Sequence, residues 1–425
     1  MSSEAVRAGY KRAEVGVIPE DWDDISLGDK TIKVGSGITP RGGEKRYKSE
    51  GLPFIRSQNI GWGILLMDDI VFIDNETHES FKSTEIEKED IFLNITGASI
   101  GRSAIADENV IGGNVNQHVC IIRTKKDQLN PEYLMYFLLS DQGQKQIDSF
   151  QAGGNRQGLN FGQIRSFNLS LPPLPEQTAI AAALSDTDAL ITALERLIAK
   201  KRDIKQAAMQ ELLTGRRRLP GFDGDWTKKK MLEVGITYSG LTGKTKEDFT
   251  EGQYPYISFL NVMKNVAIDI NMPDHVNIRS NESQNQVKKG DLFFNVSSET
   301  PEEVGMCSAL LEDLSNVYLN SFCFGFRLFK VHDPNPLFLT YWFRSDSGRN
   351  TIYSLAQGST RYNISKTNLM QLEIPYPPLP EQTAIATILS DMDAGIAELE
   401  RKRDKVRNIK EGMMQELLTG RIRLI

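Results

Sequence analysis

The sequence PPLPEQTAIA occupies Pro172–Ala181 and occurs again, unchanged, at Pro377–Ala386. A second sequence, MQELLTGR, occupies Met209–Arg216 and recurs at Met414–Arg421. Both repeats have the same offset of 205 residues (377 − 172 and 414 − 209). Self-similarity at so long a period indicates two large units in tandem, and not a solenoid of short repeats.

Each repeated stretch predicts one long helix. Pro175 and Pro380 suit the first turn of a helix, and Gly215 and Gly420 suit its end. Each helix of ~38 residues would be roughly 57 Å long. Apolar residues recur at steps of four and three, which is typical of a coiled coil or helical bundle. The predicted seam is Ile180, Leu184, Ile191, Leu194, Ile198 and Leu212 in the first copy, and Ile385, Leu389, Met392, Ile396, Leu399, Val406, Met413 and Leu417 in the second.

The two long helices are expected to pair with each other; the alternative is two ordinary core helices. Polar residues interrupt the seam of the first copy at Thr187, Lys201 and Lys205. A coiled coil of these two helices alone would therefore bury little apolar surface. Spare apolar residues such as Ala181, Leu190 and Leu197 therefore predict further helices from a partner.

The rest of the chain predicts an α+β fold. Short apolar runs broken by Gly, Asn and Asp predict strands, and Pro131–Leu139 predicts a buried helix. We expect two globular domains, each followed by a long helix, with the helices forming an antiparallel coiled coil of pseudo-two-fold symmetry. The expected segments are a first domain at 1–171, a helix at 172–219, a second domain at 220–375 and a helix at 376–425, with a flexible arm over residues 1–20.

The two globular domains repeat only loosely. The run 90–94 (DIFLN) matches 291–295 (DLFFN), and 52–55 matches 254–257, but the loops between such runs differ. The helices are near copies while the domains are not. This pattern indicates that the helices share one task and that each domain recognises something different.

Composition limits the class of protein. The chain has 425 residues, of which 40% are hydrophobic and 25% charged, and this is ordinary for a globular protein. A net charge of −6 argues against an indiscriminate nucleic-acid binder, which would be basic. The three cysteines form no CxxC pair, which favours a reducing cytoplasm over a disulfide framework. We expect neither a signal peptide nor a membrane span.

The doubled PPLPEQ–helix–ELLTGR segment resembles the repeat regions of the specificity subunit of type I restriction–modification systems. The stretches GYKRAEVGVIPEDW, beginning at Gly9, and AGGNRQGLNFGQI, beginning at Ala152, resemble its target-recognition domains. The similarity extends over essentially the whole chain. It implies a non-catalytic subunit in which each domain reads one half of a split, asymmetric DNA site.

The resemblance also implies partners. The paired helices would set the spacing between the half-sites and dock two modification subunits, which would hold S-adenosylmethionine and methylate adenine. Two restriction subunits could be added, with ATP and Mg for translocation and cleavage. No cofactor or metal is expected in this chain, and no membrane partner.

Candidate DNA contacts are the polar and basic residues of the loops. Arg can bond guanine and Asn or Gln can bond adenine in bidentate fashion, while Lys mostly binds phosphate. For any one residue the alternative is an ordinary solvated loop. The candidates are Thr39, Arg41, Lys45, Arg46, Lys48, Arg56, Ser57, Gln58, Asn59, Thr96, Arg102, Asn116, Gln117, Arg156 and Gln157 in the first domain, and Thr242, Lys244, Lys246, Ser258, Asn261, Ser297, Asn320, Arg361 and Asn363 in the second.

Catalysis within this chain is not expected. The four histidines are scattered, which does not support a metal site or a nucleophile–histidine pair. No Asn/Asp-Pro-Pro-aromatic motif of adenine methyltransferases occurs, because the paired prolines follow Leu171 and Tyr376. Two rival hypotheses are a helical scaffold whose domains bind proteins, favoured by the acidic charge, and a stand-alone nuclease or methyltransferase.

Overall fold

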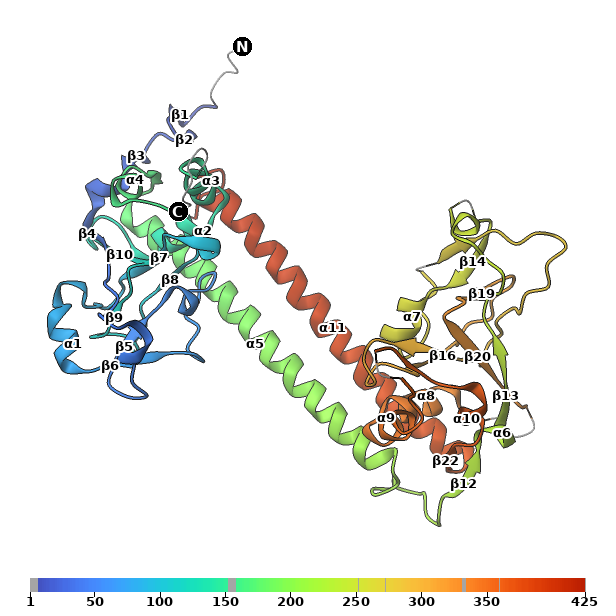
Figure 1. Cartoon of the computed structure of the whole chain (residues 1–425). Helices are drawn as coiled ribbons and strands as arrows, with labels where there is room; N and C mark the ends of the chain where they lie inside the picture. The colour runs from blue at the N-terminus through green and yellow to red at the C-terminus, as the bar shows by residue number, and fades with distance from the viewer. Residues whose placement is uncertain are drawn as a thin grey trace. The chain divides into compact units, whose positions relative to one another are not determined.

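A computed structural model describes residues 7–151, 158–250, 252–271, 273–330, 334–358 and 360–424. Its contacts divide the chain into two compact units. Unit 1 comprises Met1–Leu194 with Lys402–Ile425, and unit 2 comprises Glu195–Arg401. Each unit therefore contains one globular domain and part of both long helices, α5 (Leu174–Leu212) and α11 (Leu379–Leu417) (Figure 1).

The domain of unit 1 is built mainly from short strands, with four short helices and several 3₁₀ turns among them. Its elements are β1 (Tyr10–Ala13), β2 (Gly16–Pro19), β3 (Asp23–Ser26), β4 (Thr31–Ser36), β5 (Leu52–Ile55), β6 (Val71–Ile73), α1 (Asn75–Ser80), β7 (Ile91–Asn94), β8 (Ser103–Ile105), β9 (Asn114–Val115), β10 (Val119–Thr124), α2 (Pro131–Leu139), α3 (Asp141–Ser149), α4 (Phe161–Arg165) and β11 (Asn168–Leu171).

The domain of unit 2 follows a similar order. Its elements are β12 (Thr227–Lys230), α6 (Met231–Val234), β13 (Gly235–Ser239), β14 (Tyr254–Ile257), α7 (Phe259–Lys264), β15 (Asp274–Val276), β16 (Leu292–Asn295), β17 (Ser297–Ser298), β18 (Cys307–Ala309), β19 (Tyr318–Leu319), β20 (Cys323–Leu328), α8 (Pro336–Arg344), α9 (Asp346–Tyr353), β21 (Tyr362–Asn363), α10 (Lys366–Met370) and β22 (Glu373–Tyr376).

The sheets of the two domains have the same topology. A four-stranded antiparallel sheet is ordered β4-β10-β7-β8 in unit 1 and β13-β20-β16-β18 in unit 2. A three-stranded sheet is ordered β6-β5-β9 and β15-β14-β19, and its last pair is parallel in both cases. The loose sequence repeat therefore encodes the same fold twice. Its mixture of helices and strands confirms the predicted α+β class.

The PPLPEQ stretches attach each long helix to the domain that precedes it. Gln177 accepts a hydrogen bond at 2.8 Å from the backbone N–H of Asn130, the N-cap of α2. Gln382 does the same at 2.9 Å with Asn335, the N-cap of α8. Both glutamines are buried, so their hydrogen bonds are needed to offset the loss of water.

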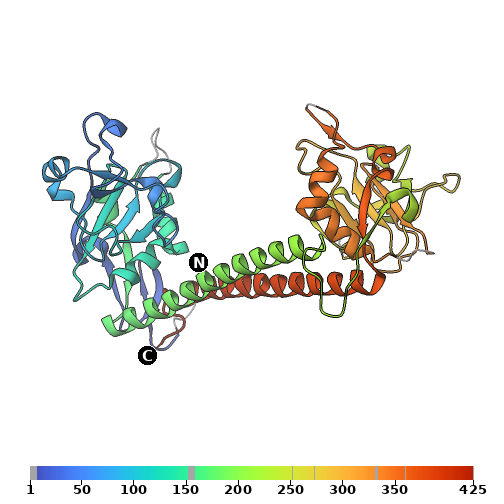
Figure 2. The same cartoon turned by 90° about the horizontal axis from the view of Figure 1, so that it is seen from below.

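Within each unit α5 and α11 run antiparallel, as the sequence predicted (Figure 2). In unit 1 the Asp188 carboxylate accepts from Tyr136 at 2.9 Å and from Lys410 at 2.6 Å. In unit 2 Asp393 accepts from Tyr341 at 2.8 Å and from Lys205 at 2.5 Å. Each contact thus has a counterpart 205 residues further along or back (393 − 188, 341 − 136 and 410 − 205).

The predicted seam residues are buried or half-buried. Ile180, Leu184 and Leu417 join the core of the first domain, and Leu212, Ile385 and Leu389 join that of the second. Ala181, expected to be spare, also lies in the first core, whereas Leu190 and Leu197 are exposed. The expectation for Ala181 was wrong because the domain itself covers that face of the helix.

The expected N-terminal arm is wrong for residues 10–19, which form the β1–β2 hairpin. The hydroxyl of Tyr10 donates at 3.0 Å to the carbonyl of Gly420, and Ile18 is buried in the first core. Gly420, the partner of Tyr10, lies at the other end of the chain, so local composition could not reveal this contact.

Candidate nucleic-acid interface

The same four chain segments meet at one edge of each domain. In unit 1 they are the end of β4 and the residues that follow β5, β7 and β9. In unit 2 they are the end of β13 and the residues that follow β14, β16 and β19. In unit 1 the backbone N–H of Asn116 donates to Ile55 at 2.9 Å, and Gly37 donates to Asn116 at 3.2 Å. In unit 2 Asn320 donates to Ile257 at 3.0 Å.

A glycine makes this convergence possible in each domain. A Cβ on Gly37 would lie 1.6 Å from the carbonyl oxygen of Val115, and one on Gly240 would lie 2.1 Å from that of Asn320. Any side chain here would force the strand ends apart. The matching sequences SGIT, beginning at Ser36, and SGLT, beginning at Ser239, therefore belong to one shared scaffold.

In unit 1 four polar side chains form a chain of hydrogen bonds on this scaffold. The hydroxyl of Thr39 donates to Gln117 Oε1, and Gln117 Nε2 lies 3.1 Å from Nε2 of His118. Nδ1 of His118 lies 2.6 Å from the hydroxyl of Thr96. Gln117 is exposed at the tip, and the buried Asn116 holds the turn by accepting from the N–H of His118 at 3.0 Å.

In unit 2 the same turn carries different side chains. Asn320 accepts from the N–H of Phe322 at 2.8 Å, as Asn116 does from His118. Phe322 has 57% of its surface exposed. Nearby, Arg361 Nε donates to Ser297 Oγ at 3.2 Å, and β17 pairs with β21 through Ser297 and Asn363.

Lys366 adds a positive charge to this part of unit 2. Its Nζ donates at 2.7 Å to the hydroxyl of Ser239, at the end of β13, and lies 5.9 Å from the ring centre of Phe324. Burial lowers the pKa of Lys366 below its ordinary value. The candidate interface of unit 2 thus combines hydroxyls, an arginine, a lysine and an exposed aromatic ring.

A basic loop lies elsewhere in unit 1. Arg41 and Arg46 line a hollow of about 350 Å³ with Thr77, Ser80 and other residues of the α1 region. Lys45 and Lys48 are exposed in the same stretch of chain. Exposed cations without a fixed geometry suit contacts to phosphate better than the reading of base edges.

Four sequence candidates have internal partners. The side chain of Arg56 donates to the backbone oxygen of Asp69 at 2.6 Å, and Gln58 donates to the carboxylate of Asp69. The side-chain amide of Asn94 donates to the backbone carbonyl of Ser57 at 2.8 Å. Arg102 is half-buried, and its backbone carbonyl accepts from the N–H of Asn94 at 2.9 Å.

Three other candidates for DNA contact have side chains that are buried in structural roles, which contradicts the expectation for them. The amide of Asn59 donates to the carbonyl of Leu66 at 2.9 Å, and Asn261 donates to that of Asp269 at 2.8 Å, so both close loops. The side chain of Lys244 is only 1% exposed and pairs with Glu282. Loop composition suggested contact with DNA because sequence does not reveal which polar side chains point inward.

Two other predicted residues lie in the second domain. Lys246 is exposed in a 3₁₀ turn, and Ser258 is half-buried directly after β14. Arg156 and Gln157 lie outside the described residues. Sequence reasoning missed His118, Phe322 and Lys366. Both His118 and Phe322 follow an asparagine by two residues, and comparison of the two copies could have revealed this signal.

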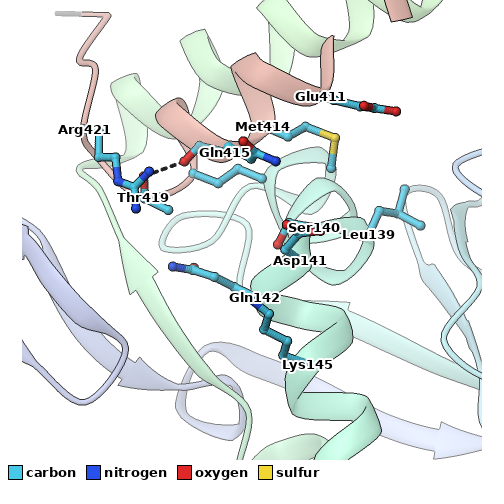
Figure 3. A pocket seen from close by; sticks show the side chains of 11 residues that line it. Leu139, Ser140, Asp141, Gln142, Lys145, Glu411, Met414, Gln415, Thr419 and Arg421 are labelled. Carbon is cyan, nitrogen blue, oxygen red and sulfur yellow. Dashed lines mark hydrogen bonds between the residues drawn. The ribbon is translucent and has the colours of Figure 1, made fainter. Parts of the chain in front are cut away.

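Each unit also has a hollow between its domain and the long helices. In unit 1 a hollow of about 580 Å³ has α3 residues such as Asp141 and Lys145 on one wall and α11 residues such as Glu411 and Met414 on another (Figure 3). In unit 2 a hollow of about 720 Å³ is lined by residues of α5, α11 and the loop around Asn265. These hollows place polar and apolar groups beside one another, which suits protein contacts.

Among the described residues no cluster of His, Cys, Asp and Glu could hold a metal ion. Across the same part of the chain, no helix combines the length and apolar character needed to cross a membrane.

The fold and these two sites define a recognition protein with two related domains that present different side chains. The family model of the type I restriction modification DNA specificity domain matches residues 19–206 and again 223–407. The chain therefore belongs to the type I restriction–modification DNA specificity family, as the sequence predicted, and it is a non-catalytic specificity subunit.

Similar proteins support this placement. The putative type I restriction enzyme MjaX specificity subunit of Methanocaldococcus jannaschii is 24% identical, and the alignment covers 98% of this chain and 97% of that protein. The type I restriction enzyme EcoKI specificity subunit of Escherichia coli K12 is 24% identical over 96% of this chain and 90% of its own length. DNA recognition is therefore favoured over the protein scaffold.

Solved structures share the fold. The crystal structure of the HsdS subunit from Thermoanaerobacter tengcongensis has a TM-score of 0.51 at 16% identity, covering 95% of this chain and 98% of that one. A chain from a structure describing complex assembly and conformational transition of the type I R-M system has a TM-score of 0.58 at 17% identity, covering 95% and 99%.

Proposed function

We propose that the domain of each unit reads one half of a bipartite, asymmetric DNA site. The observation that carries this proposal is the shared scaffold with different side chains: Asn116 and Asn320 hold the same turn, but the turn presents Gln117 and His118 in unit 1 and Ser321 and Phe322 in unit 2. One fold with two chemistries suits two different base sequences.

We further propose that the basic loop of unit 1 positions the duplex. Arg41, Lys45 and Arg46 are exposed and would bind phosphate oxygens, which fixes register without reading sequence. A net charge of −6 is compatible with this role, because most of the phosphate contacts of the complex would come from partner subunits.

The long helices would dock two modification subunits. The hollows beside Asp141 in unit 1 and beside Asp393 in unit 2 offer one contact region per unit. The partners would hold S-adenosylmethionine, and ATP and Mg where two restriction subunits also join. The three buried, unpaired cysteines fit a complex that works in the reducing cytoplasm.

The test is methylation of random-sequence DNA by this chain, co-purified with its modification partner and supplied with S-adenosylmethionine. Sequencing of the modified adenines should give one split motif with two different halves. Replacement of residues 225–375 by the corresponding domain of a relative should change one half of the motif only.

Two results would count against the proposal. An assembled, cofactor-loaded complex that modifies no preferred sequence would favour the protein scaffold. A domain replacement that changes both halves of the motif would contradict the assignment of one half-site to each domain.

A further inference from the structure

The amide of Gln117 is held by hydrogen bonds at both its oxygen and its nitrogen. Its Oε1 accepts the Thr39 hydroxyl, so the carbonyl side faces Thr39 and the NH2 side faces His118. With the amide in this orientation, a neutral His118 accepts through Nε2 and donates from Nδ1 to the Thr96 hydroxyl at 2.6 Å. The network therefore holds the amide group in place before any ligand arrives.

The amide of Gln117 still has a hydrogen-bond donor and an acceptor that the network does not use. A primary amide has two N–H donors and two carbonyl lone pairs, and the network uses one of each. Gln117 is exposed, so the second donor and the second lone pair are open to a ligand. Adenine presents a matching acceptor and donor, N7 and N6–H, at its major-groove edge.

At the equivalent turn, unit 2 cannot make this pair of hydrogen bonds to adenine. Ser321 stands where Gln117 stands, and a hydroxyl is too short to offer a donor and an acceptor side by side. Phe322, at the position of His118, is instead 57% exposed although its N–H is fixed by Asn320 at 2.8 Å. A phenyl ring held outward on a polar surface suits contact with the methyl group of thymine.

We propose that Gln117, positioned by Thr39 and His118, reads an adenine in the half-site of unit 1. At the equivalent place in the half-site of unit 2, Phe322 contacts a thymine methyl group. This assignment rests on the proposed function and names the bases that the two sites recognise.

The adenine contact is tested by competition binding with the full complex and a duplex containing its own motif. Each adenine of the half-site of unit 1 is replaced in turn by 7-deazaadenine, which lacks the N7 acceptor. One replacement should weaken binding about 5- to 150-fold. Gln117→Ala should remove this sensitivity. His118→Ala should reduce it, while His118→Asn, which can still bond the amide, should restore part of it.

The thymine contact is tested by replacing each thymine of the other half-site with uracil, which lacks only the methyl group. The wild-type complex should bind one uracil duplex less tightly, and Phe322→Ala should bind the thymine and uracil duplexes equally. Glu132→Gln, an exposed change in α2, is the control and should respond as the wild type does.

The outcomes separate the two proposals. A wild-type complex with no split motif would overturn the proposed function itself. A split motif combined with unchanged base-analogue sensitivity in Gln117→Ala and Phe322→Ala would overturn this inference alone.

Discussion

In each unit a buried glutamate accepts hydrogen bonds from a tryptophan and an arginine. Glu176 accepts from the indole N–H of Trp22 at 3.0 Å and from Arg423 at 2.5 and 2.7 Å. In unit 2 Glu381 accepts from Trp226 at 2.9 Å and from Arg218 at 2.6 and 2.7 Å. These hydrogen bonds raise the pKa of both arginines, so each stays charged beside its carboxylate.

We predict that Glu176→Ala lowers the free energy of unfolding by about 1–3 kcal/mol, because it leaves a buried indole N–H without its acceptor and leaves Arg423 with Asp21 as its remaining carboxylate partner. Urea unfolding followed by tryptophan fluorescence measures this loss. Glu381→Ala should behave alike in unit 2.

Glu398→Gln is the matched control for both variants, since Glu398 is an exposed residue of α11. It should change the free energy of unfolding by less than about 0.5 kcal/mol. A loss for Glu176→Ala as small as that of the control would show that the buried carboxylate is not needed for stability.

At the scale of the element, α5 carries apolar residues that the described part of the chain leaves exposed, one in unit 1 and two in unit 2. Leu190, Leu197 and Ile204 are 44%, 39% and 45% exposed. They are spaced by seven residues, which places them on one face of a helix. The sequence predicted spare apolar positions for partner helices at Leu190 and Leu197, and both are exposed.

We predict that the triple variant Leu190→Ala, Leu197→Ala, Ile204→Ala weakens association with the modification subunit by about 2 kcal/mol, roughly 30-fold. Its own unfolding free energy should change by less than about 1 kcal/mol. Analytical ultracentrifugation of the two subunits and urea unfolding of this chain measure the two effects.

Leu184→Ala provides the contrast, because Leu184 is fully buried in the first core. It should cost about 2–5 kcal/mol of stability. Full-strength association by the triple variant would refute the assignment of this face to the partner.

At the scale of the whole molecule, each unit contains its own buried thiols. Cys120 lies in unit 1, and Cys307 and Cys323 lie in unit 2, all of them buried and unpaired. Burial raises the pKa of Cys120 and of Cys307 to about 12. The thiolate is the reactive form, so the native thiols should be inert near pH 8.

We predict that none of the three thiols reacts with a disulfide reagent at pH 8 in the native protein, and that all three react in denaturant. Labelling a Cys120→Ala variant through a urea titration would report the opening of unit 2 alone. Rapid labelling of Cys120 in the native protein would contradict the described packing of the first core.

The sequence by itself determined the duplicated plan. The repeat offset and the four-three apolar spacing gave two long helices, which begin at Leu174 and Leu379 and end three residues before Gly215 and Gly420. Short apolar runs broken by Gly, Asn and Asp located strands such as β5 and β7 within a residue or two. These features are local, because helix ends and strand patterns depend on neighbouring residues.

Only the tertiary structure decided which polar residues face outward and what completes each unit. Asn59 and Asn116 look alike in sequence, yet one closes a loop and the other supports the exposed Gln117. Arg423 and the β1–β2 hairpin meet residues hundreds of positions away, at Glu176 and Gly420. The direction of a side chain and its distant partners follow from packing between segments far apart in the sequence, which local patterns do not encode.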